Sequence, residues 1–67
     1  LMEIHLQGRD HDIKLVVESP ETVRQVLVQA GILPSTVLVS FESTILPHAT
    51  VLSQSVKLLV TTVSSGG

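Results

Sequence analysis

Residues 19–32 read SPETVRQVLVQAGI, and this stretch decides the fold. Ser19-Pro20-Glu21 predicts a helix start, because serine can accept a hydrogen bond from a free amide, proline suits the first turn and glutamate faces the positive end of the helix dipole. We expect the helix to run to Ala30, because Gly31 suits the left-handed residue that ends many helices. Its apolar residues have helical spacing and form one stripe to be buried: Val23, Val26, Leu27 and Ala30.

Segments with strand-like alternation flank this helix on both sides. Before it, residues 2–7 and 13–17 alternate apolar and polar side chains, and the polar turn 8–12 closes them into a hairpin. Residues 48–55 show no period and are expected to form an irregular connection. Three further segments are expected to be extended: residues 36–42, the short edge piece 45–47 and residues 56–63.

A hairpin followed by one helix can bury the helix stripe only against a sheet. The order of elements therefore predicts an α+β domain, ββαββ with a short extra strand. Its mixed sheet of four to five strands is expected to carry the helix across one face. A chain of 67 residues is long enough for one domain and too short for two. We expect residues 1–67 to form that domain, with a flexible tail over residues 64–67.

The composition argues against several classes of partner. Six acidic and four basic residues give a net charge of -2, so the chain lacks the basic surface that binds a phosphate backbone, and we expect no nucleic-acid partner. The chain has no cysteine and therefore no disulfide or thiol nucleophile. Its apolar runs are far shorter than the roughly 20 residues that span a bilayer, and no leader-like segment opens it. We expect a soluble, cytoplasmic protein without a membrane partner.

Catalytic and metal-binding patterns are also missing from the sequence. His5, His11 and His48 lack the spacing of zinc ligands, so we expect no metal site. No Gly-x-Ser-x-Gly elbow and no glycine-rich phosphate loop occur, so the chain is expected to bind no cofactor and not to be an enzyme. The two lysines, Lys14 and Lys57, are expected to be solvent-facing strand residues.

Three stretches stand out in this order of elements: the hydrophobic strand Val37-Leu38-Val39, the hydrophobic-proline step Ile45-Leu46-Pro47 and the ending Ser64-Ser65-Gly66-Gly67. Together with the order of elements they resemble the β-grasp family of ubiquitin-like sulfur carriers, which includes the thiamin-pathway carrier, the small subunit of molybdopterin synthase and archaeal relatives. Two turns depart from the family pattern. Glu42-Ser43-Thr44 stands where the family has Asn-Gly, and Ser53-Gln54-Ser55 stands where it has Asp-Gly-Asp. Both turns therefore use residues less suited to positive φ.

The resemblance implies a function for the last residue. An E1-like enzyme would use ATP to adenylate the Gly67 carboxylate, and sulfur would then convert it to a thiocarboxylate for thiamin, molybdopterin or thiolated-tRNA synthesis. Ser64, Ser65 and Gly66 would form the slim tail that enters the partner's site, because glycine has no Cβ to obstruct the passage. The outer sheet face would dock partners, among them the sulfur-accepting synthase subunit. Its expected apolar residues are Val16, Leu38, Leu59 and Val63.

Two other interpretations remain open at this point. The activated Gly67 could be transferred to lysines of target proteins, as in ubiquitin-like modifiers. Alternatively, the chain could be a non-carrier β-grasp interaction module in which Ser-Ser-Gly-Gly is a linker to further sequence.

Overall fold

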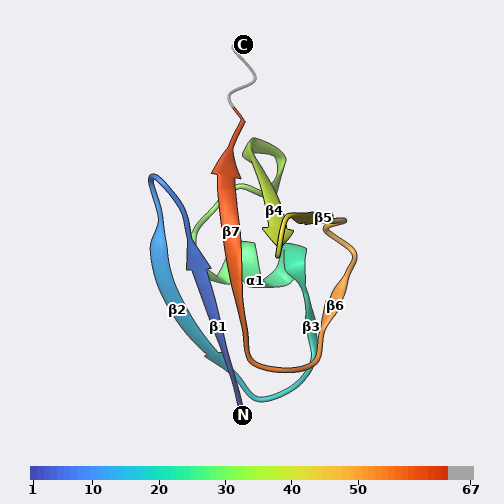
Figure 1. The fold of residues 1–67 in the computed structure, drawn as a ribbon. Helices are drawn as coiled ribbons and strands as arrows, with labels where there is room; N and C mark the ends of the chain where they lie inside the picture. Colours follow the sequence, from blue (N-terminus) through green and yellow to red (C-terminus); the bar gives the residue numbers. More distant parts are fainter. Residues whose placement is uncertain (64–67) are drawn as a thin grey trace.

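The computed structural model describes residues 1–63 and has two layers, a mixed sheet with one helix across one face (Figure 1). The five strands of the main sheet lie in the order β2-β1-β7-β4-β5. Strands β1 and β7 run parallel in the middle, and the other pairs are antiparallel. The predicted α+β class and mixed sheet are therefore confirmed. The strands are β1 (Met2–Gln7), β2 (Asp12–Val17), β4 (Val37–Phe41), β5 (Thr44–Leu46) and β7 (Val56–Thr62).

The hydrophobic core lies between the inner face of this sheet and helix α1 (Val23–Gln29). The predicted stripe faces the sheet: Val23, Val26 and Leu27 are buried, and Ala30 packs partly buried beside them. Alternation along the strands supplies the other side of the core. Its buried strand residues are Ile4, Leu6, Val17, Val37, Val39, Leu52, Leu58 and Val60.

The helix begins three residues later than the sequence analysis predicted. Thr22 is the N-cap, and its hydroxyl accepts from the amide of Gln25 at 3.1 Å while the Gln25 side chain accepts from the amide of Thr22 at 2.8 Å. Ser19 as the cap was therefore wrong. The reciprocal Thr-x-x-Gln capping box satisfies two amides, whereas serine alone could satisfy one. This signature was present in the sequence and was overlooked.

A second, two-stranded sheet explains where residues 19–22 go instead. Strand β3 (Glu21–Thr22) pairs antiparallel with β6 (Val51–Leu52), and the amide of Val23 donates to the carbonyl of Thr50 at 2.9 Å. The expectation of an irregular connection over residues 48–55 was therefore wrong for this pair. Both strands are too short for a period to be visible in the sequence.

The predicted end of the helix is confirmed in detail. Gly31 has φ of +80°, the amide of Ile32 donates to the carbonyl of Leu27, and that of Gly31 donates to Val28. These two bonds are the Schellman pattern. The chain then turns through a short 3₁₀ helix, η1 (Pro34–Thr36), into β4. No helix in residues 1–63 has the length and apolar character needed to cross a bilayer.

The turn between β4 and β5 uses residues in the left-handed region. Glu42 has φ of 49° and Ser43 has φ of 71°, between the paired residues Phe41 and Thr44. Two consecutive positive φ angles in a two-residue hairpin loop define a type I′ turn, which favours Asn-Gly. The expected positive φ angles are therefore confirmed at this turn, whereas Ser53, Gln54 and Ser55 have none, so the expectation was wrong for the second turn.

Replacing the turn residues should stabilise the protein. We predict that Glu42→Asn with Ser43→Gly raises the free energy of unfolding by about 1 kcal/mol, because both new residues tolerate positive φ. Urea unfolding followed by far-ultraviolet circular dichroism measures this. As the control, Ser53→Gly lies outside the two positive-φ positions and should lower stability slightly, since glycine there only adds freedom to the unfolded chain. A double variant less stable than the parent would contradict this account of the turn.

Candidate functional site

The outer face of the sheet, opposite α1, is the candidate site. Along the central strand β7, Leu58 and Val60 are buried against the core, so Lys57, Leu59 and Thr61 point to the other side. Leu59 is consequently 53% exposed although it lies in the middle of the sheet. An apolar side chain held this rigidly in solvent is available for contact with another molecule.

Three of the four predicted docking residues come together on this face. Leu38 lies opposite Thr61 in the β4–β7 register, and Thr61 lies between Leu59 and Val63 along the chain. The amide of Val63 donates to the carbonyl of Thr36 at 2.8 Å, which holds Val63 beside β4 after β7 has ended. Leu38, Leu59 and Val63, all exposed, are called the outer apolar cluster below.

Val16 is separate from this cluster. It is exposed as predicted, but it lies on the edge strand β2 opposite Glu3, two strands away from β7 and toward the other end of the sheet. In its place, β5 contributes Ile45, which is 60% exposed and lies opposite Ser40, the residue that is itself opposite Leu59. Ile45 was missed because its face depends on the register with β4, which the sequence does not display.

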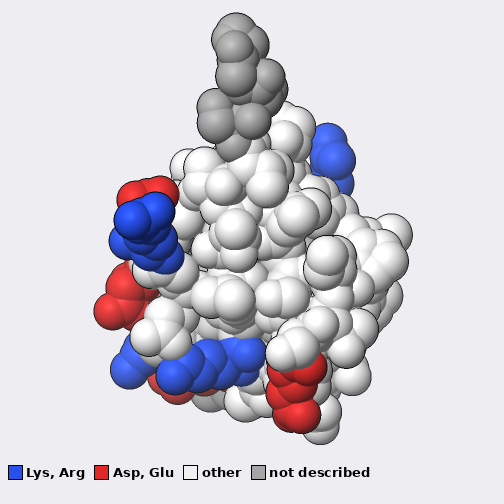
Figure 2. Space-filling model, turned by 45° about the horizontal axis from the view of Figure 1, so that its top comes forward, with Lys and Arg blue, Asp and Glu red and all other residues white. Residues whose placement is uncertain are grey.

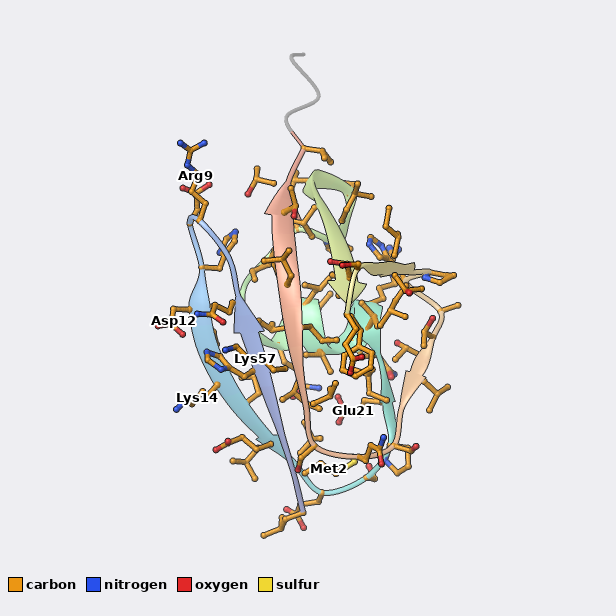
Figure 3. The ribbon with its side chains drawn as sticks, viewed as in Figure 1. Met2, Arg9, Asp12, Lys14, Glu21 and Lys57 are labelled. Atoms are coloured by element: carbon orange, nitrogen blue, oxygen red, sulfur yellow. The ribbon has the colours of Figure 1, made fainter. Side chains whose placement is uncertain are left out.

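A row of polar side chains crosses the sheet beside the cluster. His5 on β1 lies opposite Lys14 on β2 and opposite Lys57 on β7, so the three are neighbours on the outer face. Figure 3 shows Lys14, Lys57 and Asp12 on this side of the molecule. The His5 Nε2 atom donates to the Asp12 Oδ1 atom at 2.6 Å, since an ionised carboxylate can only accept. We call Lys14, His5 and Lys57 the basic row.

The side chains of the basic row lower the pKa of the Asp12 carboxylate. The hydrogen bond from His5 is the largest effect and holds the pKa of Asp12 below its ordinary value of 3.8. Desolvation opposes it, and the charges of His5, Lys14 and Lys57 each lower the pKa by a smaller amount. A depressed pKa in the folded state means that ionised Asp12 contributes stability above about pH 4, and that this contribution is lost as the pH falls through the folded value.

We therefore predict that Asp12→Asn reduces the pH dependence of stability on the acid side. The free energy of unfolding of the parent should fall more steeply than that of Asp12→Asn between about pH 5 and about pH 2, so the difference between them shrinks toward low pH. Urea unfolding at a series of pH values measures both curves. Parallel curves would contradict the role given to the His5–Asp12 hydrogen bond.

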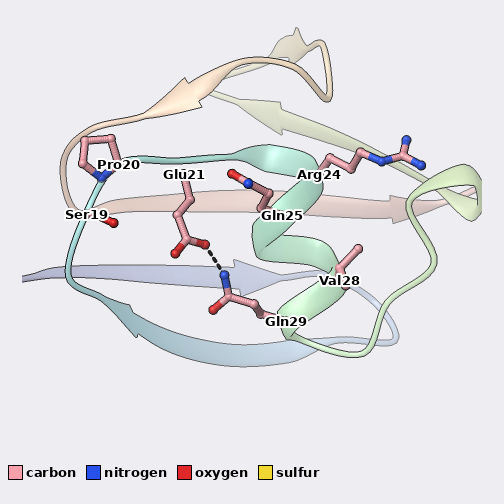
Figure 4. A pocket seen from close by; sticks show the side chains of 7 residues that line it. All are labelled: Ser19, Pro20, Glu21, Arg24, Gln25, Val28 and Gln29. Atoms are coloured by element: carbon pink, nitrogen blue, oxygen red, sulfur yellow. Dashed lines mark hydrogen bonds between the residues drawn. The ribbon is translucent and has the colours of Figure 1, made fainter.

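Another hollow lies on the opposite layer of the molecule, beside the helix. About 470 Å³ of open space borders the solvent side of α1 and the segment before it, lined by residues that include Pro20, Arg24 and Val28. Figure 4 shows Glu21 accepting a hydrogen bond from Gln29 across it. The hollow faces away from the sheet and from the outer apolar cluster. It presents no group of three metal-binding side chains, and none occurs elsewhere in residues 1–63.

Uncharged surface dominates the end of the molecule where the described chain stops. In Figure 2 the Lys, Arg, Asp and Glu side chains lie on the left, across the lower part of the visible face and at the upper right, and the field between them consists of other residues. The predicted tail residues Ser64, Ser65, Gly66 and Gly67 lie outside the described residues.

No protein-family model matches the chain, and no curated protein matches its sequence.

Proposed function

We propose that this protein is a β-grasp sulfur carrier, activated at the Gly67 carboxylate by a separate E1-like enzyme in the cytosol. The observation that carries the proposal is the placement of β7. This strand is central in the sheet, and it ends at Thr62 beside the outer apolar cluster. After Val63 the sequence continues with Ser-Ser-Gly-Gly. A partner docked on the cluster would therefore lie next to the point from which these four residues continue.

The length and composition of those four residues suit delivery to a neighbouring site. Four residues reach at most about 13 to 14 Å when extended. Gly66 and Gly67 have no Cβ, so their backbone could pass a narrow opening and approach a phosphate closely. Serine at 64 and 65 adds little bulk. The folded domain would thus supply the binding surface, and the tail would supply the reacting atoms.

The proposed chemistry needs no catalytic group on this chain. A carboxylate oxygen of Gly67 attacks the α-phosphorus of ATP, forming an acyl adenylate and releasing pyrophosphate. Sulfide then attacks the acyl carbon, the bond from that carbon to the bridging oxygen breaks, and AMP leaves. The product is a thiocarboxylate, which a sulfur-accepting synthase subunit would consume. The activating enzyme contributes the nucleotide site and the electrostatic stabilisation of the phosphate.

Intact-mass measurement tests this function directly. We predict that the chain ending at Gly67, incubated with an E1-like enzyme from the same genome, ATP and sulfide, gains the mass difference between sulfur and oxygen. The matched control carries one additional residue after Gly67 and should gain nothing, because its carboxylate is displaced from the reacting position. An unchanged mass with every E1-like enzyme of that genome would contradict the proposal. Di-glycine or longer tail remnants ending at Gly67 on target lysines, without any thiocarboxylate, would instead favour a protein modifier.

The outer apolar cluster gives a second test with an internal control. Leu59→Ser should lower kcat/KM for thiocarboxylate formation by roughly tenfold, because it removes apolar area from the centre of the proposed contact. Val16→Ser removes a similarly exposed apolar side chain on the same face but outside the cluster, and should stay within about twofold of the parent. Equal effects of the two substitutions would show that the cluster is not the docking surface.

A further inference from the structure

Two opposite charges, Lys57 and Glu42, line one small hollow on the outer face of the sheet. Ser40 and Leu59 are the last residues paired in the β4–β7 register; Lys57 precedes Leu59 by two residues on β7, and Glu42 follows Ser40 by two residues, in the turn after β4. The hollow has a volume of about 300 Å³, and its other lining residues are Gln7, Ser40, Ser43, Leu58 and Leu59. The hollow therefore offers donors and acceptors around an apolar centre.

Glu42 and Lys57 do not form an ion pair with each other. Opposite charges that face across strands commonly form a pair. In residues 1–63, however, the one ion pair is that of His5 with Asp12, and neither Glu42 nor Lys57 takes part in a side-chain hydrogen bond. Lys57 and Glu42, which line the same hollow, thus remain available to groups from another molecule.

The backbone conformation at Glu42 is also unusual. Glu42 and Ser43 both hold positive φ angles, at a cost of roughly 1 to 2 kcal/mol for each non-glycine residue. The two-residue hairpin loop requires these angles, and Asn-Gly would adopt them at lower cost. Glu42 and Ser43 are therefore not the residues that stability alone favours at this turn.

We propose that this hollow fixes the orientation of the activating partner, an inference that rests on the proposed carrier function. The partner would place a carboxylate against Lys57, a basic or amide N–H donor against Glu42, and an apolar side chain over Leu59 between them. Lys57 continues into the basic row on one side, and Glu42 is an acid on the other, so the face has opposite charges at its two ends. Such a face favours one orientation of a complementary surface over its reverse.

Continuity with the outer apolar cluster identifies the occupant as a protein rather than a small molecule. Leu59 belongs to the cluster and also lines the hollow. A partner that covers Leu59 from the cluster side therefore extends over Lys57 and Glu42. One surface of the partner would contact both the apolar residues and the two charges. This contact would align the end of β7 with the partner's nucleotide site.

Exchanging the two charges tests the proposal. Glu42→Lys with Lys57→Glu keeps the net charge and reverses the polarity of the hollow. We expect kcat/KM for thiocarboxylate formation to fall roughly tenfold, mainly through KM, and the difference to shrink at high salt. The control exchange, Glu18→Lys with Arg24→Glu, moves exposed charges that do not line the hollow and should stay within about twofold of the parent.

The turn variant separates a binding role from a purely structural one. Glu42→Asn with Ser43→Gly should be activated several-fold more slowly while unfolding at higher urea concentration, whereas a merely structural turn would give faster or equal activation. If the parent is activated and the charge exchange stays within twofold of it, the orienting hollow is refuted while the carrier function stands. If no E1-like enzyme of the same genome activates the parent, both proposals fail together.

Discussion

Burial of one helix stripe against one face of a mixed sheet is the constraint on which the rest of the structure depends. Val26 and Leu27 are completely buried, and so are Ile4, Leu6 and Val39 on the sheet. Because side chains alternate along a strand, filling this inner face forces the intervening residues outward. The exposed position of Leu59 between buried Leu58 and Val60 is thus a direct consequence of core packing. The candidate site therefore lies on the opposite face of the same sheet, away from the core.

The arrangement assigns different tasks to different parts of the chain. The sheet is a rigid support, since its central strands are paired on both sides. The outer apolar cluster and the charged hollow lie on that support, where their geometry is set by strand register rather than by loops. In the proposed function, reaction occurs only at Gly67, so the domain itself needs affinity and orientation without a catalytic pocket. A domain of this size has a stability of about 3 to 10 kcal/mol, which leaves little to sustain a strained pocket.

The sequence was informative where a pattern is local and less so where it depends on distant pairing. The helix stripe, the Gly31 stop and the alternating strands were predictable because each rests on spacing within one segment. Ser19 competed with Thr22 for the helix cap, and the reciprocal bond with Gln25 decided in favour of threonine. Strands β3 and β6 have two residues each, too few for a period. The separation of Val16 from the cluster and the placement of Glu42 and Lys57 around one hollow depend on strand pairing, which the sequence does not display.

The most direct measurement of the central claim is ATP–pyrophosphate exchange, which reports formation of the acyl adenylate itself. With an E1-like enzyme from the same genome, labelled pyrophosphate should enter ATP only when this chain is present and its terminal Gly67 carboxylate is free. Exchange that persists when that carboxylate is converted to an amide, or exchange that never depends on the chain, would contradict the account.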